Sequence, residues 1–168
     1  MEFKRLDKLE ITEEQFRQIM EVENSTNTGY SEEIMKNIWL EDEKDDNFVC
    51  IKNDRIVAHI SFNPKSMRRN GSIYMVNLTV LDECRKQGIA QNLIYAACVY
   101  YKNKGVEKLM SLQVDKDNLP ALNLYKKVGY EIKDPVCEAD EDDEQYVMDS
   151  SIDNIIKTIE CNIKKRSC

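Results

Sequence analysis

A short basic stretch, CRKQGIAQNL at residues 84–93, combines residue types that could hold an anion. It follows a run rich in β-branched residues and precedes a run with helical periodicity, so it should form the turn that opens a helix. The first N–H groups of a helix lack partners within it, and the helix dipole adds partial positive charge there. Gly88 would let the backbone approach a ligand, and Arg85 and Lys86 would add positive charge. The stretch therefore predicts a pyrophosphate site, with a turn glycine among solvated charges as the alternative.

Two longer strings carry a family resemblance. NLTVLDECRKQGIAQNLI resembles the acetyl-CoA-binding motif of the GNAT family of N-acetyltransferases, a strand followed by Arg/Gln-x-x-Gly-x-Gly/Ala and a helix. Downstream, DNLPALNLYKKVGYEI resembles the family segment Asn-x-x-Ala-x-x-Leu-Tyr-x-x-x-Gly-Phe, with Tyr130 in place of the usual Phe. The matching residues of the two motifs are Arg85, Gly88 and Ala90, then Asn118, Ala121, Leu124, Tyr125 and Gly129. The resemblance covers roughly residues 1–150.

The resemblance implies that acetyl-CoA is the co-substrate, and it assigns residues to each part of that molecule. Backbone groups of three residues at a strand end would pair with the pantetheine arm and face the thioester: Leu78, Thr79 and Val80. The turn and the start of the helix would take the pyrophosphate: Arg85, Lys86, Gln87, Gly88, Ile89, Ala90 and Gln91. The side chain of Asn118 would bond to the pantetheine arm.

The same resemblance makes Tyr125 the expected general acid, because a phenol keeps its proton at neutral pH and can protonate a departing thiolate. A core aromatic on a short helix is the alternative role for this residue. The general base stays unassigned, because Gln113 occupies a strand position where some family members have Glu. His59 could be a base or a buried sheet histidine, and Asn77 could orient a water molecule.

We therefore expect transfer of an acetyl group to a primary amine by direct attack in a ternary complex. Carboxylates in the two regions that usually bind the acceptor, 24–33 and 138–144, favour a cationic acceptor such as a polyamine, a peptide or protein amine, or an amino-sugar antibiotic. For 138–144 a solvated acidic loop is the alternative. The alternative function is a catalytically silent CoA-binding regulatory or structural domain, which the missing base keeps open.

Hydrophobic periodicity and capping residues predict the elements that position these residues. Thr12 and Gln15 have the spacing of a capping box, and Gly105 should end the long central helix. The expected helices are 11–23, 31–40, 88–105, 118–129 and 151–165, and the expected strands are 47–51, 55–62, 72–80, 107–114, 130–133 and 145–150. This order, with the resemblance, implies an α/β (α+β) protein of the GNAT-like acyl-CoA N-acyltransferase fold: a central mixed, mostly antiparallel twisted sheet flanked by helices. We expect one domain over 1–150 and a helical extension over 151–168 that packs on the domain or at a subunit contact, which leaves a homodimer possible.

Composition narrows the class of protein. The chain has 168 residues and a formal net charge of -7, which argues against a nucleic-acid partner. The early residues do not resemble a signal peptide and no apolar run approaches the length of a membrane helix, so we expect a cytoplasmic protein without a membrane partner. One histidine and six cysteines without a Cys-x-x-Cys pair argue against a metal site, and the thiols should be reduced and mostly structural.

Overall fold

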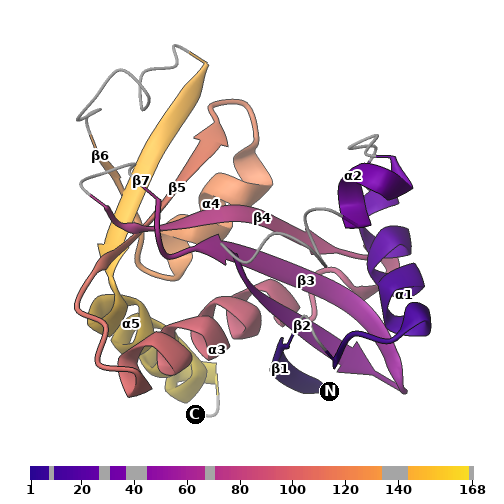
Figure 1. Ribbon diagram of the computed structural model, residues 1–168. Helices are drawn as coiled ribbons and strands as arrows, with labels where there is room; N and C mark the ends of the chain where they lie inside the picture. The colour runs from indigo at the N-terminus through magenta and orange to yellow at the C-terminus, as the bar shows by residue number, and fades with distance from the viewer. Residues whose placement is uncertain (8–9, 27–30, 37–44, 67–70, 134–143, 167–168) are drawn as a thin grey trace. The chain divides into compact units, whose positions relative to one another are not determined.

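The computed structural model describes residues 1–7, 10–26, 31–36, 45–66, 71–133 and 144–166 (Figure 1). Its strands are β1 (Glu2–Leu6), β2 (Asp46–Lys52), β3 (Arg55–Asn63), β4 (Ile73–Val80), β5 (Leu109–Asp115), β6 (Glu131–Lys133) and β7 (Gln145–Ser151). Its helices are α1 (Glu13–Asn24), α2 (Glu32–Lys36), α3 (Ile89–Asn103), α4 (Leu119–Lys127) and α5 (Ile152–Arg166), with a short 3-10 helix at Asp82–Cys84.

The strands form a mixed sheet in the order β1-β2-β3-β4-β5-β7-β6. β4 and β5 pair in parallel, whereas β1 with β2, β2 with β3, β5 with β7, and β6 with β7 are antiparallel. This architecture confirms the predicted fold class. The contacts divide the chain into a first unit, residues 1–62 and 76–96, and a second unit, residues 63–75 and 97–168, so β4 and α3 each contribute to both.

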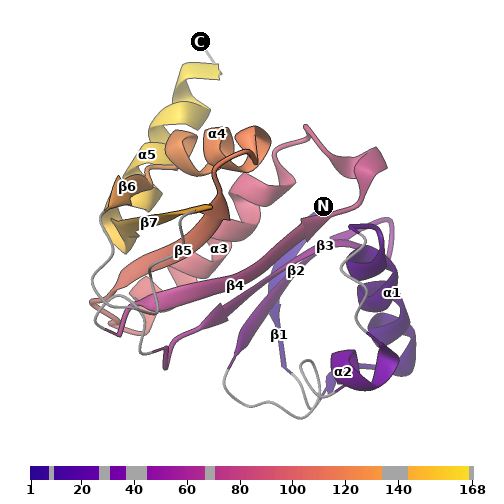
Figure 2. The same cartoon turned by 90° about the horizontal axis from the view of Figure 1, so that it is seen from above.

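The first unit is built on the β2–β3 hairpin and on α1. Asn53 and Asp54 at the hairpin turn have left-handed φ values of 50° and 61°, as a two-residue turn matched to the strand twist requires. Thr12 and Gln15 form the predicted capping box, with Oγ1 of Thr12 accepting from the Gln15 N–H at 3.2 Å. Figures 1 and 2 show α1 and α2 on the same side of β2 and β3. The buried face of α1 is apolar except for Glu23, with Ile19 fully buried.

The second unit packs α4 and α5 beside one another (Figure 2). The predicted cap of α4 is confirmed, since Asn118 Oδ1 accepts from the Ala121 N–H at 3.2 Å. α5 buries an apolar stripe made of Ile152, Ile155, Ile156 and Ile159. Its amides also reach the end of α4, because Asn162 Nδ2 donates to the Lys127 carbonyl at 2.9 Å and Asn154 Nδ2 to the Gly129 carbonyl at 3.0 Å. These contacts fix α5 on the second unit.

Strand β1 was not predicted, because its sequence EFKRL carries three charged residues and only Leu6 is buried. The helix expected over 31–40 is described as far as Lys36, and the remainder of that expectation lies outside the described residues. None of the described helices has the length and apolar character needed to cross a membrane.

Candidate functional site

The turn before α3, which the sequence predicts to bind an anion, contains two residues with left-handed backbone. Lys86 and Gly88 both have left-handed φ values, 61° and 80°. The turn leads directly into the first turn of a 15-residue helix, where backbone N–H groups lack partners within the helix. A Cβ added to Gly88 would meet its nearest atom, Asn92 Nδ2, at 3.8 Å, so the space above this glycine is open.

The side chains of the turn are less available than the sequence suggested. Arg85 Nη2 lies 2.7 Å from Asp82 Oδ1, and its Nε donates to the Val80 carbonyl at 3.2 Å, so the guanidinium is held within the turn. The Ile89 side chain is buried, so that residue can offer a ligand only backbone atoms. Lys52, which the sequence did not indicate, brings another cation to the turn, donating from Nζ to Gln87 Oε1 at 2.9 Å.

The end of the strand that leads into this turn belongs to the same unit. Leu78, Thr79 and Val80 form the end of β4, and the following Leu81 N–H donates to the Val57 carbonyl at 3.0 Å. Thr79 is buried, and Leu78 and Val80 are half-buried. The first unit therefore brings together the predicted thioester-facing strand and the predicted pyrophosphate turn.

The other predicted residues, Asn118 and Tyr125, lie on or next to α4 in the second unit. Tyr125 is 9% exposed, and its ring packs edge-on against Tyr130 with centroids 5.9 Å apart. Burial, with a smaller effect of nearby Tyr74, raises the pKa of Tyr125 to about 12. The phenol therefore keeps its proton at neutral pH, as an acid for a departing thiolate must.

A second polar pair in that unit involves a residue that the sequence did not single out. Tyr74 Oη donates to Gln113 Oε1 at 3.1 Å, and the neighbouring Ser72 and Ser111 hydroxyls are also hydrogen-bonded. Because β4 and β5 pair in parallel at Tyr74 and Ser111, residues two positions apart on each strand share one face. Gln113 thus lies on the same face as Tyr74. The sequence alone could not have paired Tyr74 with Gln113, because 39 positions separate them and only the parallel strand register brings them together.

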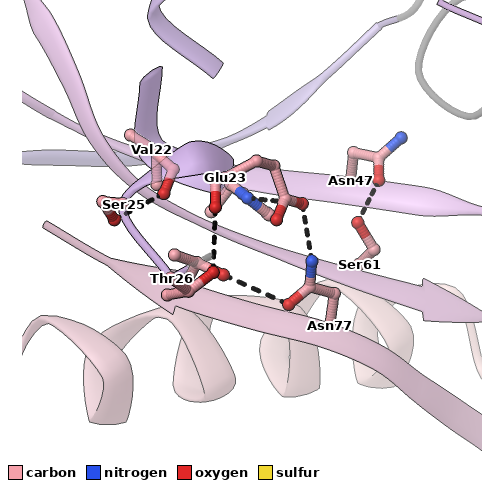
Figure 3. A network of polar contacts seen from close by, with 9 residues as sticks. Val22, Glu23, Ser25, Thr26, Asn47, Ser61 and Asn77 are labelled. Carbon is pink, nitrogen blue, oxygen red and sulfur yellow. Dashed lines mark hydrogen bonds and ion pairs between the residues drawn. The ribbon is translucent and has the colours of Figure 1, made fainter. Parts of the chain in front are cut away.

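A third polar cluster lies in the first unit and contains His59, considered above as a base, and Asn77, considered above for orienting a water molecule. Figure 3 shows Asn77 and Glu23 of this cluster. His59 is fully buried, and its Nε2 is 2.9 Å from Glu23 Oε1. Asn77 Nδ2 donates to the same oxygen at 2.5 Å, and Asn77 Oδ1 accepts from Thr79 Oγ1 at 3.2 Å. These contacts favour a buried sheet histidine over a base at His59, and both ends of the Asn77 amide are engaged.

Within the described part of the chain, no group of three or more His, Cys, Asp or Glu side chains could hold a metal ion. Of the six cysteines, Cys50, Cys84 and Cys98 are buried and Cys161 is exposed. Burial raises the pKa of the Cys98 thiol to about 12, so this thiol remains protonated.

Comparison with known proteins places the chain among acetyltransferases. The family model described as "Acetyltransferase (GNAT) family" matches residues 9–130. N-alpha-acetyltransferase 30 of Schizosaccharomyces pombe is 29% identical over 85 residues, which is 49% of this chain and 55% of that protein. The chain spans between 22% and 55% of the length of the curated relatives that it matches.

Solved structures show the same fold at low sequence identity. The ribosomal-protein-S18-alanine N-acetyltransferase of Escherichia coli superposes with a TM-score of 0.68 at 17% identity, covering 90% of this chain and 93% of that one. The PaiA N-acetyltransferase of Thermoplasma acidophilum, solved in complex with coenzyme A, gives a TM-score of 0.62 at 16% identity and covers 90% and 99%.

Proposed function

Because the chain belongs to the acetyltransferase (GNAT) family, we propose that it is an acetyl-CoA-dependent N-acetyltransferase acting on a primary amine. The observation that carries this proposal is the turn at residues 84–91. It has left-handed residues at two positions, an uncrowded glycine and a helix start, and these features suit a bound pyrophosphate. A related protein of this fold has been solved with coenzyme A bound.

Two groups of residues in the first unit would hold the donor. The amides from Gln87 to Gln91 would bind the pyrophosphate, with Lys86 and Lys52 adding positive charge. The backbone of Leu78, Thr79 and Val80 would pair with the pantetheine arm, and one N–H of this strand would donate to the thioester oxygen. Loss of one such donor to a developing oxyanion typically costs about 3 kcal/mol of activation free energy. Asn118 would bond to the pantetheine arm, in addition to capping α4.

The reaction needs a proton donor and a proton acceptor. The amine attacks the thioester carbon directly in a ternary complex, the C–N bond forms, and the C–S bond breaks. Tyr125 would give its phenolic proton to the departing sulfur, and burial, which raises its pKa to about 12, keeps the phenol protonated until the thiolate forms. A water molecule held by the Tyr74–Gln113 pair would take the proton from the amine, since an amide cannot act as a base.

The acceptor we propose is a cationic amine: a polyamine, a peptide or protein amine, or an amino-sugar antibiotic. The net charge of -7 supports this choice, because an acidic protein attracts cations from solution. Residues 138–143, most of the acidic stretch expected to contact the acceptor, lie outside the described residues.

Thermal unfolding with acetyl-CoA, CoA and NAD tests the donor site first. A ligand that binds the folded state alone, at 100 times its Kd, stabilises it by about 2.7 kcal/mol. We expect both CoA species, and not NAD, to raise the Tm. Release of free thiol with a panel of amines then tests transfer. A Tm shift without thiol release for any amine would favour the silent CoA-binding domain, and no shift at millimolar acetyl-CoA would refute both functions.

A further inference from the structure

A buried polar cluster joins the end of α1 to strands β3 and β4 within the first unit (Figure 3). Its centre is the Glu23 carboxylate, which is 3% exposed. One oxygen of this group meets both Asn77 Nδ2 at 2.5 Å and His59 Nε2 at 2.9 Å. The proposed chemistry uses none of these three side chains.

The position of Glu23 disfavours its negative charge for two reasons. It lies in the last turn of α1, where the helix dipole disfavours a negative charge, and burial disfavours the charge further. Burial alone would raise the pKa of Glu23, but the hydrogen bond and charge of His59 and the hydrogen bond of Asn77 outweigh it, and the pKa is lowered. A buried charged group held by such contacts is poor evidence for added stability, and the best-attested role of such a group is to select one arrangement of the chain.

The arrangement selected here involves the end of β4. The Asn77 side chain donates to Glu23 and accepts from Thr79 Oγ1 at 3.2 Å, so one amide connects α1 with the strand segment that follows. Asn77 and Thr79 point to one face of β4, and Leu78 between them points to the other. The cluster therefore fixes the backbone at Leu78 from the side of α1.

We propose that Glu23 is a positioning residue, which acts through Asn77 to hold the backbone of Leu78–Val80 in the orientation that the thioester needs. This inference rests on the proposed function, which assigns the donor to that strand segment. A misplacement of about 1 Å by a change remote from the chemistry can cost roughly 100-fold in rate. Because the pyrophosphate turn is not part of the cluster, donor affinity should survive a change at Glu23.

The experiment compares Glu23→Ala, Glu23→Gln and Asn77→Ala with a matched control, Asn47→Ala. Asn47 is also buried in the first unit, 1% exposed, and accepts from Ser61 Oγ at 2.6 Å (Figure 3). That pair joins β2 to β3. For each variant we would measure kcat, the Kd for acetyl-CoA by calorimetry, and the Tm, assaying well below the lowest Tm.

Glu23→Ala should lower kcat by about 10-fold to 100-fold, while the Kd for acetyl-CoA changes less than about threefold. Asn77→Ala should reproduce this loss even if Glu23→Ala does not fold. Glu23→Gln keeps an oxygen that accepts from Asn77, so its kcat should exceed that of Glu23→Ala by about tenfold. Asn47→Ala should lower the Tm without this loss of kcat.

Three results would overturn the inference. The first is a kcat equal to that of the wild type in Glu23→Ala or in Asn77→Ala. The second is a kcat of Glu23→Gln as low as that of Glu23→Ala. The third is a fall in the kcat of Asn47→Ala as large as the fall in Glu23→Ala. Failure of the proposed function looks different, because the wild-type protein would then neither bind acetyl-CoA nor release thiol. An active wild type with an equally active Glu23→Ala refutes positioning alone.

Discussion

Replacing Tyr130 by Phe should stabilise the protein. The Tyr130 side chain is 2% exposed, and no hydrogen-bond partner for its hydroxyl exists in the part of the chain that the structure describes. Burial first, with smaller effects of Cys98 and Tyr125, raises its pKa well above the usual value of 10.0, so the phenol is buried with its proton. The family segment that this region resembles usually has Phe here, and a Phe ring would make the same edge-on contact with Tyr125 without a buried polar atom.

The size of the effect follows from two opposing quantities. A buried hydroxyl without a hydrogen bond costs about 1–3 kcal/mol in protein mutational data. Its removal leaves a void smaller than a methyl group, and a methyl-sized void costs about 1 kcal/mol. The free energy of unfolding should therefore rise by about 1 kcal/mol, which for a chain of this length raises the Tm by about 2–4 °C.

Urea and thermal unfolding of wild type and Tyr130→Phe measure this change, and the urea midpoint should rise with an unchanged m-value. Tyr74→Phe is the matched control, because the phenol it removes donates to Gln113 at 3.1 Å. The free energy of unfolding of Tyr74→Phe should fall by about 1 kcal/mol relative to the wild type. A Tm of Tyr130→Phe at least 2 °C below wild type would refute the reasoning, since the hydroxyl would then have a partner in the folded protein.

Three further predictions concern the proposed site and the buried cluster. Tyr125→Phe should lower kcat by about 100-fold with a nearly unchanged Kd for acetyl-CoA, measured by thiol release and calorimetry; an unchanged kcat would remove Tyr125 as the acid. Gly88→Glu should raise the Kd for acetyl-CoA at least about tenfold, because a side chain at φ 80° is strained and its charge repels phosphate; equal binding would contradict a pyrophosphate site. Because the pKa of Glu23 is lowered from 4.5, its contribution to stability is complete above about pH 4.5 and is lost as the pH falls through the folded value. The stability difference between wild type and Glu23→Gln, from urea unfolding at several pH values, should therefore shrink in acid, and a difference that grows there would refute the sign.

Local signals in the sequence predicted most of the described elements correctly. The capping box at Thr12, the cap at Asn118 and the left-handed Gly105 all depend on residues within a few positions of one another. Strand β1 escaped prediction because an edge strand with one buried side chain has no apolar alternation, although its Arg5 forms an ion pair with Asp46 of β2.

The parts of the site that the sequence did not predict come from long-range pairing. Glu23 reads as the charged end of an apolar stripe, and its contact with Asn77 spans 54 positions. The Tyr74–Gln113 bond depends in the same way on strand register. The left-handed backbone conformation of Lys86 could not be predicted from the sequence, because Lys has no preference for that conformation. The motif predicted the position of the turn. The side chains that lie beside the turn could be identified only from the tertiary structure.

Because α5 is hydrogen-bonded to the end of α4, the C-terminal segment supports the helix that contains Tyr125, the proposed acid. The family match ends at residue 130, yet two asparagines beyond residue 150 donate to the carbonyl groups that end the helix of Tyr125. A chain cut at residue 150 would keep every motif residue and would leave those carbonyl groups to water. The C-terminal helix thus supports the end of the helix that contains Tyr125.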